Sequence, residues 1–162
     1  MNAPRHFEDW QPGEVLQFGR YEVTAAEIKE FAIEFDPQSF HLDEEAAKDS
    51  LFGGLIASGW HSAGIMMRLI VDHGAFVGAN IASPGFDDIA WTKPVRPGDV
   101  LSVRVEVTRK RRSESKPDRG VVSFRQELLN QDGEIAMSLD SLVLYRCREP
   151  GEDAARAEAG GA

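Results

Sequence analysis

The stretch that decides the fold is SGWHSAGIMMRLIVDHG, residues 58–74. Ser58 is a suitable N-cap and Gly74 a suitable C-cap, so the segment between them predicts one helix of roughly four turns. At 100° per residue, the polar side chains His61, Arg68 and Asp72 share one narrow stripe, and apolar side chains cover most of the remaining circumference. We therefore expect this helix to be buried and wrapped by the rest of the chain.

The hydrophobic period changes to two from Gly85 onward. Alternation of this kind is typical of β-strands with one buried face, and we expect four of them. Their ranges are 86–93, 100–112, 120–131 and 134–147, and an earlier strand, 14–23, is interrupted at Gly19. Asp132-Gly133 is a favourable centre for the turn between the last two. The fold class predicted is α+β, with the central helix wrapped by an antiparallel sheet of about five strands.

Two further helices are predicted before the central one. Thr24 and Glu27 form a capping box at the start of the first, which Pro37 stops because the residue before a proline avoids helical geometry. Asp43 can cap a short helix that runs through Lys48. We expect one domain over residues 1–148. The following segment, 149–162, has no large apolar residue and is predicted to be disordered.

Composition excludes several classes of function. The chain has 162 residues, 42% of them hydrophobic, which is enough for one compact core. We expect no membrane span and no signal peptide, because no apolar run approaches about 18 residues. A net charge of −9 argues against nucleic acid as a partner. The single cysteine, Cys147, suits a reducing cytoplasm, and the four histidines show no metal-ligand spacing.

Candidate chemistry lies on the loop before the central helix. Asp36 and His41 stand five positions apart on either side of Pro37, so their side chains can converge on one water molecule. The carboxylate accepts a hydrogen bond, and the imidazole exchanges a proton near neutral pH. The glycines that follow, including Gly54, let the backbone approach a ligand closely, and the N–H of Gly59 begins the helix. A helix cap and a surface histidine would explain the same two side chains without catalysis.

These residues together resemble a known family, the MaoC-like acyl dehydratases, also called (R)-specific enoyl-CoA hydratases. The similarity spans about residues 21–146, nearly the whole ordered chain. It is carried by Asp36, His41, Asp43, Ala46, Ala47, the run FGGLIASGW at 52–60 and the run WTKPVRPGDVL at 91–101. The resemblance implies a hot-dog fold, a homodimer whose sheets join edge to edge, and activity on acyl-CoA thioesters with no cofactor or metal beyond the CoA of the substrate.

Residue by residue, the resemblance places Asp36 and His41 on the catalytic aspartate and histidine of the family. Gly59 falls on the glycine whose N–H binds the thioester oxygen, and Ser58 and Gly54 are expected to contact the substrate. The reaction implied is reversible hydration of a trans-2-enoyl-CoA, without membrane or nucleic-acid partners. The chain departs from the family at Phe35, Pro37 and Gln38 within the loop, and at Ser58, where a histidine is common.

A basic cluster near residues 109–119 has two interpretations. Arg111 and Arg112 belong either to a solvated hairpin or to a contact with the phosphates of CoA. Phe86 and Trp91 alternate with polar residues and are expected to pack on the sheet or line the acyl tunnel.

Two rival functions remain open. A hot-dog thioesterase would use the same fold and ligand for hydrolysis, but its acid or base usually lies near the start of the central helix, where this chain has no carboxylate. A non-catalytic module that binds acyl-CoA or acyl carrier protein would tolerate loss of Asp36 and His41, and this chain retains both. The length and branching of the acyl group are not predicted.

Overall fold

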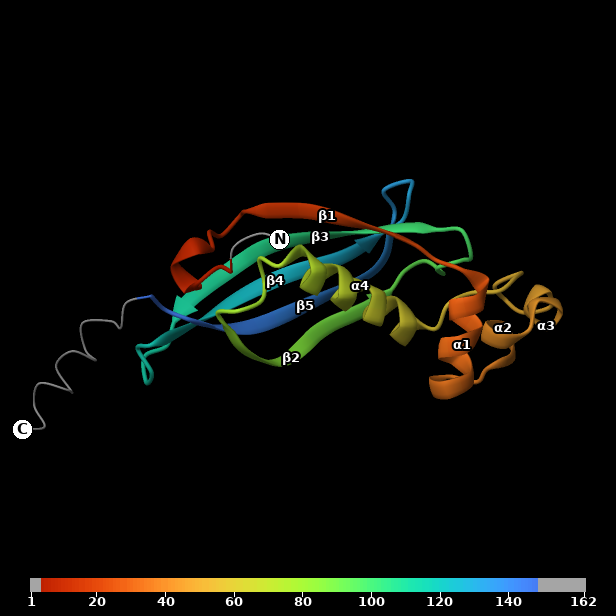
Figure 1. The fold of residues 1–162 in the computed structure, drawn as a ribbon, viewed down its shortest axis with the longest axis horizontal. Helices are drawn as coiled ribbons and strands as arrows, with labels where there is room; N and C mark the ends of the chain where they lie inside the picture. The colour runs from red at the N-terminus through yellow and green to blue at the C-terminus, as the bar shows by residue number, and fades with distance from the viewer. Residues whose placement is uncertain (1–3, 149–162) are drawn as a thin grey trace, which may run out of the picture.

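A computed structural model describes residues 4–148 of the chain. Its strands form one antiparallel sheet in the order β1-β3-β4-β5-β2, and the long helix α4 lies across one face of that sheet (Figure 1). The strands are β1 Val15–Glu22, β2 Asn80–Trp91, β3 Val100–Arg112, β4 Arg119–Leu129 and β5 Ile135–Arg146. The helices are the 3₁₀ turn η1 Phe7–Asp9, α1 Ala25–Phe35, α2 Ser39–Leu42, α3 Glu44–Lys48 and α4 Gly59–His73. This is the α+β hot-dog fold that was predicted.

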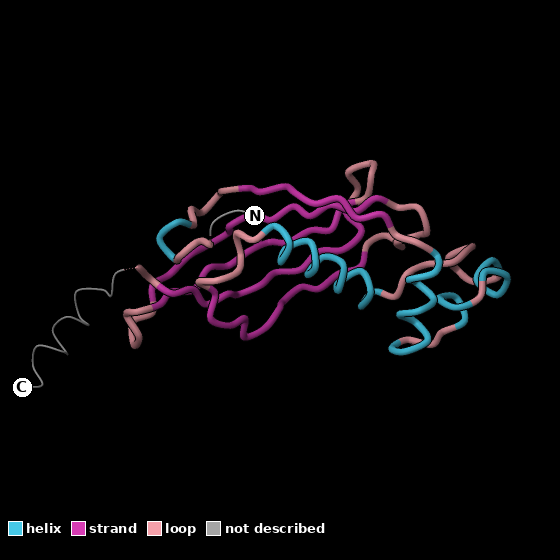
Figure 2. The backbone as a smooth tube through the Cα atoms, viewed as in Figure 1, coloured by secondary structure: helices cyan, strands magenta, loops and turns pink. Residues whose placement is uncertain are grey.

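Figure 2 shows that the strands form one layer, that α4 lies against this layer and that the shorter helices lie at its ends. Within the described residues, no helix is long and apolar enough to cross a bilayer. The segment predicted to be a disordered tail, 149–162, lies outside these residues.

The ends of α4 agree with the capping residues in the sequence. The Ser58 hydroxyl accepts a hydrogen bond from the Trp60 N–H, and Gly74 has the left-handed φ of 86° that ends many helices. Residues spaced three and four apart then face the sheet and are buried. They are Ile65, Met66, Leu69 and Ile70.

The sheet covers one side of α4, as predicted, and within a single chain it leaves the opposite side uncovered. Trp60, Met67 and Val71 lie on its outer face and are 61%, 47% and 47% exposed. The sheet can cover only the side of a helix that it touches, so the broad apolar circumference leaves an uncovered apolar strip. His61 was misplaced, because it is buried rather than part of an exposed polar stripe. Its ring stacks on Phe31 of α1 at a centroid distance of 4.9 Å.

Strand alternation predicted the core of the sheet correctly. Leu101, Val103, Val105 and Val107 of β3 are each at most 1% exposed, and Phe124 of the neighbouring β4 is fully buried. Burying an aliphatic side chain of this size contributes about 1.5–3 kcal/mol of transfer free energy. The buried side chains of these central strands therefore stabilise the sheet against which α4 packs.

The predicted break in the first strand is a bend of β1. Gly19 has a φ of 86°, and the register with β3 shifts between Phe18 and Tyr21. A Cβ at Gly19 would lie 2.9 Å from Leu69 of α4. The glycine thus permits both the bend and the close approach of the helix.

The strand predicted to start at residue 86 begins earlier, at Asn80. The segment before Phe86 contains Pro84 and Gly85 and shows no apolar alternation, so sequence patterning misses it. β2 tolerates a proline because it is an edge strand that pairs only with β5, and its register shifts three times.

Three short helices gather at the end of the sheet where α4 begins (Figure 1). The Thr24 hydroxyl accepts from the Glu27 N–H at 3.2 Å, but the Glu27 carboxylate accepts from the Tyr21 hydroxyl instead of returning to Thr24. Only half of the predicted capping box therefore forms. Asp43 caps α3 as predicted, accepting from the N–H groups of residues 45 and 46.

Candidate active site

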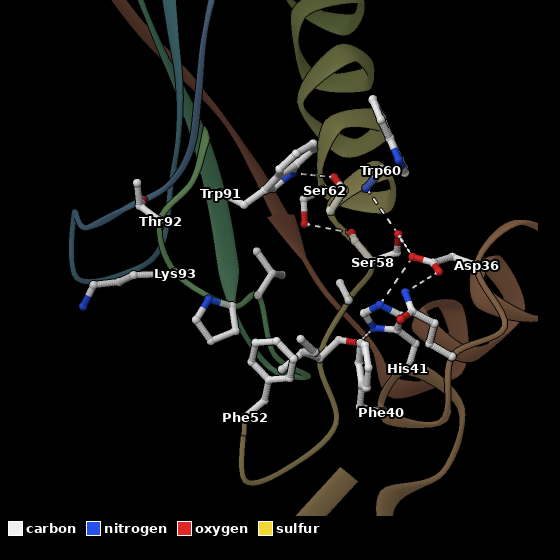
Figure 3. A pocket seen from close by; sticks show the side chains of 16 residues that line it. Asp36, Phe40, His41, Phe52, Ser58, Trp60, Ser62, Trp91, Thr92 and Lys93 are labelled. Carbon is white, nitrogen blue, oxygen red and sulfur yellow. Dashed lines mark hydrogen bonds and ion pairs between the residues drawn. The ribbon is translucent and has the colours of Figure 1, made fainter. Parts of the chain in front are cut away.

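The candidate site lies between α1, α2 and the start of α4. Helix α1 ends at Phe35, and Asp36 takes a non-helical conformation before Pro37. The chain then forms the single turn of α2, where a loop was predicted, and this turn brings His41 back toward Asp36. Nε2 of His41 lies 3.4 Å from Oδ2 of Asp36, and Figure 3 shows the two side chains pointing toward each other.

The other ring nitrogen of His41 fixes its tautomer. Nδ1 lies 2.8 Å from the carbonyl oxygen of Ile56. A carbonyl oxygen only accepts, so Nδ1 carries a proton and Nε2 of the neutral ring is an acceptor. The ring is 4% exposed, which limits its rotation. The acceptor nitrogen of a neutral His41 therefore faces a carboxylate oxygen, and a molecule with two hydrogen-bond donors, such as water, can reach both acceptors from beside the pair.

Asp36 is held as a carboxylate by neutral donors. The Ser58 hydroxyl donates to Oδ2 and the Gln38 amide donates to Oδ1, both at 2.7 Å. The Ser58 hydrogen bond is the main reason that the pKa of Asp36 lies below its ordinary value. The Gln38 amide and nearby His41 act in the same direction, against the effect of partial burial. Asp36 is thus ionised at neutral pH.

Ser58 and Gly59 bring the N-terminus of α4 into the site. Ser58 is 1% exposed, and its hydroxyl bridges the Asp36 carboxylate and the Trp60 N–H. As the first helical residue, Gly59 has an N–H with no acceptor one turn earlier in α4. The positive end of the helix dipole lies at the same point. This end of α4 can therefore stabilise negative charge.

Gly59 has a steric reason to be glycine as well. A Cβ there would lie 2.7 Å from Cε2 and 2.8 Å from Nε1 of Trp91. The indole N–H of Trp91 donates to the Gly59 carbonyl oxygen at 2.9 Å. The last residue of β2 thus covers the first residue of α4.

A cavity of about 430 Å³ joins these groups. Its walls are mostly apolar, and Lys93 at the rim pairs with Glu134 at 2.6 Å. The lining residues are Asp36, Gln38, Phe40, His41, Phe52, Ile56, Ala57, Ser58, Gly59, Trp60, Ser62, Trp91, Thr92, Lys93, Pro94 and Val95 (Figure 3).

Four of the seven residues that the sequence singled out line this cavity together: Asp36, His41, Ser58 and Gly59.

The other three do not line it. A Cβ on Gly54 would lie 3.3 Å from Arg96 Nη1, so this glycine allows a close backbone approach to a side chain. Arg111 and Arg112 end β3, and the β3–β4 hairpin lies at the opposite end of the sheet from α1–α3 (Figure 1). Arg112 pairs with Glu8 at 3.1 Å.

Sequence reasoning missed Gln38, Thr92 and Lys93 as cavity residues, and it named Trp91 only as a residue of the sheet or tunnel. Gln38 sits between Asp36 and His41, so its nearness to them was visible in the sequence. Trp91, Thr92 and Lys93 form the run that directly precedes Pro94, and a proline at this position marks the end of a strand. Within residues 4–148, no group of three or more His, Cys, Asp or Glu side chains is placed to hold a metal ion.

Comparisons with known proteins agree on one family. Residues 8–126 match the family described as MaoC like domain. A solved MaoC-like dehydratase from Rhodospirillum rubrum is 44% identical, with a TM-score of 0.82 over 90% of this chain and 99% of that one. A 3-hydroxybutyryl-CoA dehydratase from Methylorubrum extorquens is 33% identical over 63% of this chain, and the match spans 63% of that relative, less than two thirds of its length. A solved (R)-hydratase from A. caviae involved in PHA biosynthesis is 26% identical, with a TM-score of 0.68 over 84% of this chain and 97% of that one.

Proposed function

Because this chain belongs to the MaoC-like domain family of dehydratases and hydratases, we propose that it catalyses the reversible addition of water to a trans-2-enoyl-CoA, forming a (3R)-hydroxyacyl-CoA. One observation carries the proposal. Asp36 and His41 face each other across 3.4 Å in the same cavity as the N-terminus of α4.

The first step forms the bond between the water oxygen and C3. A water molecule that donates one hydrogen to Nε2 of His41 and the other to Oδ2 of Asp36 has a lone pair directed away from both. His41 accepts the proton as the oxygen attacks C3, since the pKa of Asp36 is lowered by its hydrogen bonds and this carboxylate is the weaker base. Ionised Asp36 then stabilises the imidazolium.

The electron pair of the double bond moves toward the thioester as C3 is attacked. Negative charge accumulates on the thioester oxygen, and the Gly59 N–H with the dipole of α4 stabilises it as an oxyanion. His41 then returns its proton to C2, which completes the addition of water. CoA enters and leaves as part of the substrate, and the acid–base steps use only groups of this chain.

We also propose that the chain forms a homodimer along β2. This edge strand has unpaired backbone groups, and large apolar side chains are exposed on it and on the outer face of α4. These side chains are Trp60, Met67, Val71, Phe86 and Trp91. A second copy of the chain, related by a twofold axis, would pair with the backbone of β2 and cover these apolar side chains in the same interface. A contact of Arg111 and Arg112 with CoA phosphates would then have to come from the partner subunit, because in one chain they lie far from the cavity.

The test is a hydration assay on crotonyl-CoA and a panel of longer and branched enoyl-CoAs. Absorbance of the conjugated thioester should fall while free thiol stays constant, because hydration keeps the thioester bond. Release of CoA thiol would instead favour the thioesterase. Binding of the panel without either change would favour the non-catalytic module.

A further inference from the structure

Two tryptophans stand together at one end of the catalytic cavity. Trp60 is the second residue of α4 and Trp91 the last residue of β2, and both line the cavity (Figure 3). Their rings meet edge to face, with centroids 5.4 Å apart at 75°. The hydrogen bond from Trp91 to the Gly59 carbonyl oxygen fixes the indole over the start of the helix. The hydrogen bond and the ring contact therefore hold the two indoles in a defined position at this end of the cavity, where they form a wall.

A second hollow meets the catalytic cavity at Trp60, which lines both, whereas Trp91 lines the cavity alone. This second hollow, of about 110 Å³, runs between α4 and the sheet, past Ala63, Met66 and Phe86. A third, of about 120 Å³, shares Met67, Ile70, Phe86 and Gln126 with it. We call these two hollows the α4 groove.

The α4 groove suits an alkyl chain. Its first hollow is lined almost entirely by aliphatic, aromatic and methionine side chains. The polar residue that both hollows share, Gln126, already donates to the Ser141 hydroxyl at 2.9 Å. Methylene groups placed there would be removed from water without leaving this amide donor unpaired.

We propose that the Trp60–Trp91 pair limits the acyl group to a short chain, with Trp60 standing between the catalytic cavity and the α4 groove and Trp91 holding the cavity side of the pair. This inference rests on the proposed function, which places the thioester oxygen at the Gly59 N–H. Trp91 covers Gly59 closely enough that even a Cβ there would clash, so acyl carbons that extend along α4 meet the indole. The apolar indoles favour the apolar end of the substrate over the polar CoA arm, so the acyl end is the part that meets them.

The experiment compares the wild type with Trp91→Ala and with Trp91→Phe. The alanine variant opens the wall, whereas the phenylalanine variant loses the indole N–H but keeps an aromatic ring there. For each protein, kcat/KM is measured on crotonyl-CoA and trans-2-octenoyl-CoA. Calorimetry with butyryl-CoA and octanoyl-CoA measures chain-length preference without requiring turnover. Light scattering and circular dichroism check assembly and folding, and Trp60→Ala, a change at a 61% exposed side chain, provides a second opening of the wall.

The wild type should prefer the short substrates. Each methylene newly buried is worth about fourfold in affinity, so two of them should raise the long-to-short ratio of Trp91→Ala by about fifteenfold. Trp91→Phe should stay within about threefold of the wild-type ratio, since the wall remains.

A wild type that accepts both lengths equally overturns the inference, and so do opened variants with an unchanged ratio in turnover and binding. Failure of wild type and variants to bind any acyl-CoA overturns it together with the proposed function. If chain-length-selective binding shifts as expected but no protein hydrates any substrate, the inference stands and the proposed hydration fails.

Discussion

Replacing Ser58 by alanine removes one hydroxyl that serves two partners. It donates to Oδ2 of Asp36 at 2.7 Å and accepts from the Trp60 N–H at 3.3 Å. The change therefore weakens the cap of α4 and releases one side of the candidate catalytic carboxylate. Both effects can be measured, one as stability and the other as a dependence on pH.

The magnitude follows from the two contacts. Loss of a serine N-cap costs about 1 kcal/mol, and a hydrogen bond to a charged group is worth about 1.5–3 kcal/mol. The Asp36 side chain is 22% exposed and keeps its bond from Gln38, so the lower part of the second range applies. We expect Ser58→Ala to lower the free energy of unfolding by about 2–3 kcal/mol, or the melting temperature by about 4–12 °C.

The loss should depend on pH in a defined direction. The hydrogen bonds of the folded state depress the pKa of Asp36 below its ordinary value of 3.8. A depressed carboxyl pKa contributes stability above the unfolded pKa and loses it as pH falls through the folded pKa. The difference between wild type and variant should therefore be full at neutral pH and shrink toward the capping contribution below 3.8.

Urea unfolding at neutral pH and at successively lower pH measures this difference. Ser62→Ala is the matched control, because Ser62 is also buried on α4 but donates to the Ser58 carbonyl oxygen rather than to a carboxylate. The control should lose about 1 kcal/mol or less, equally at each pH. A Ser58→Ala loss below about 0.5 kcal/mol, or one that does not change on acidification, would refute the reasoning.

Three further predictions concern the proposed catalytic pair, the proposed dimer and the proposed CoA contact. Asp36→Asn and His41→Gln should each lower kcat by about a hundredfold or more, and the double variant should lose little beyond the worse single one. Asp72→Asn, at an exposed residue far along α4, is the control, and a catalytic variant within about threefold of wild type would remove that residue from the mechanism. Light scattering at micromolar protein should give the mass of a dimer, and a monomer would contradict pairing along β2. Charge reversal at Arg111 and Arg112 should raise KM for CoA substrates and spare short pantetheine analogues, whereas an equal effect on both substrates would argue for a solvated hairpin.

The sequence by itself determined the regular elements whose signals are local. The caps Ser58 and Gly74 delimit α4 because capping involves residues within one turn of each other. Alternation from Leu101 to Val107 predicts the buried face of β3, since every second side chain of a strand points the same way. The candidate pair, Asp36 and His41, is similarly close in sequence, so a loop and a single turn suffice to bring its members together.

Tertiary structure decided which surfaces these elements cover. His61 has the same helical position whether exposed or buried, and its burial depends on tertiary packing, including the stack on Phe31 of α1. The start of β2 has no alternating pattern and becomes a strand by pairing with β5. Trp60, Met67 and Val71 on the outer face of α4 are as apolar as the residues buried on its inner face, yet the sheet can contact only one face.

The environment of the candidate site was decided in the same way. Ser58 lies 22 residues from Asp36, and Trp91 lies 32 residues from Gly59. No periodic pattern links positions so far apart, because their contact depends on how β2 and α1 pack against the end of α4. The sequence therefore predicted which groups could carry the chemistry, whereas packing decided that Ser58 holds the carboxylate and that an indole covers the glycine.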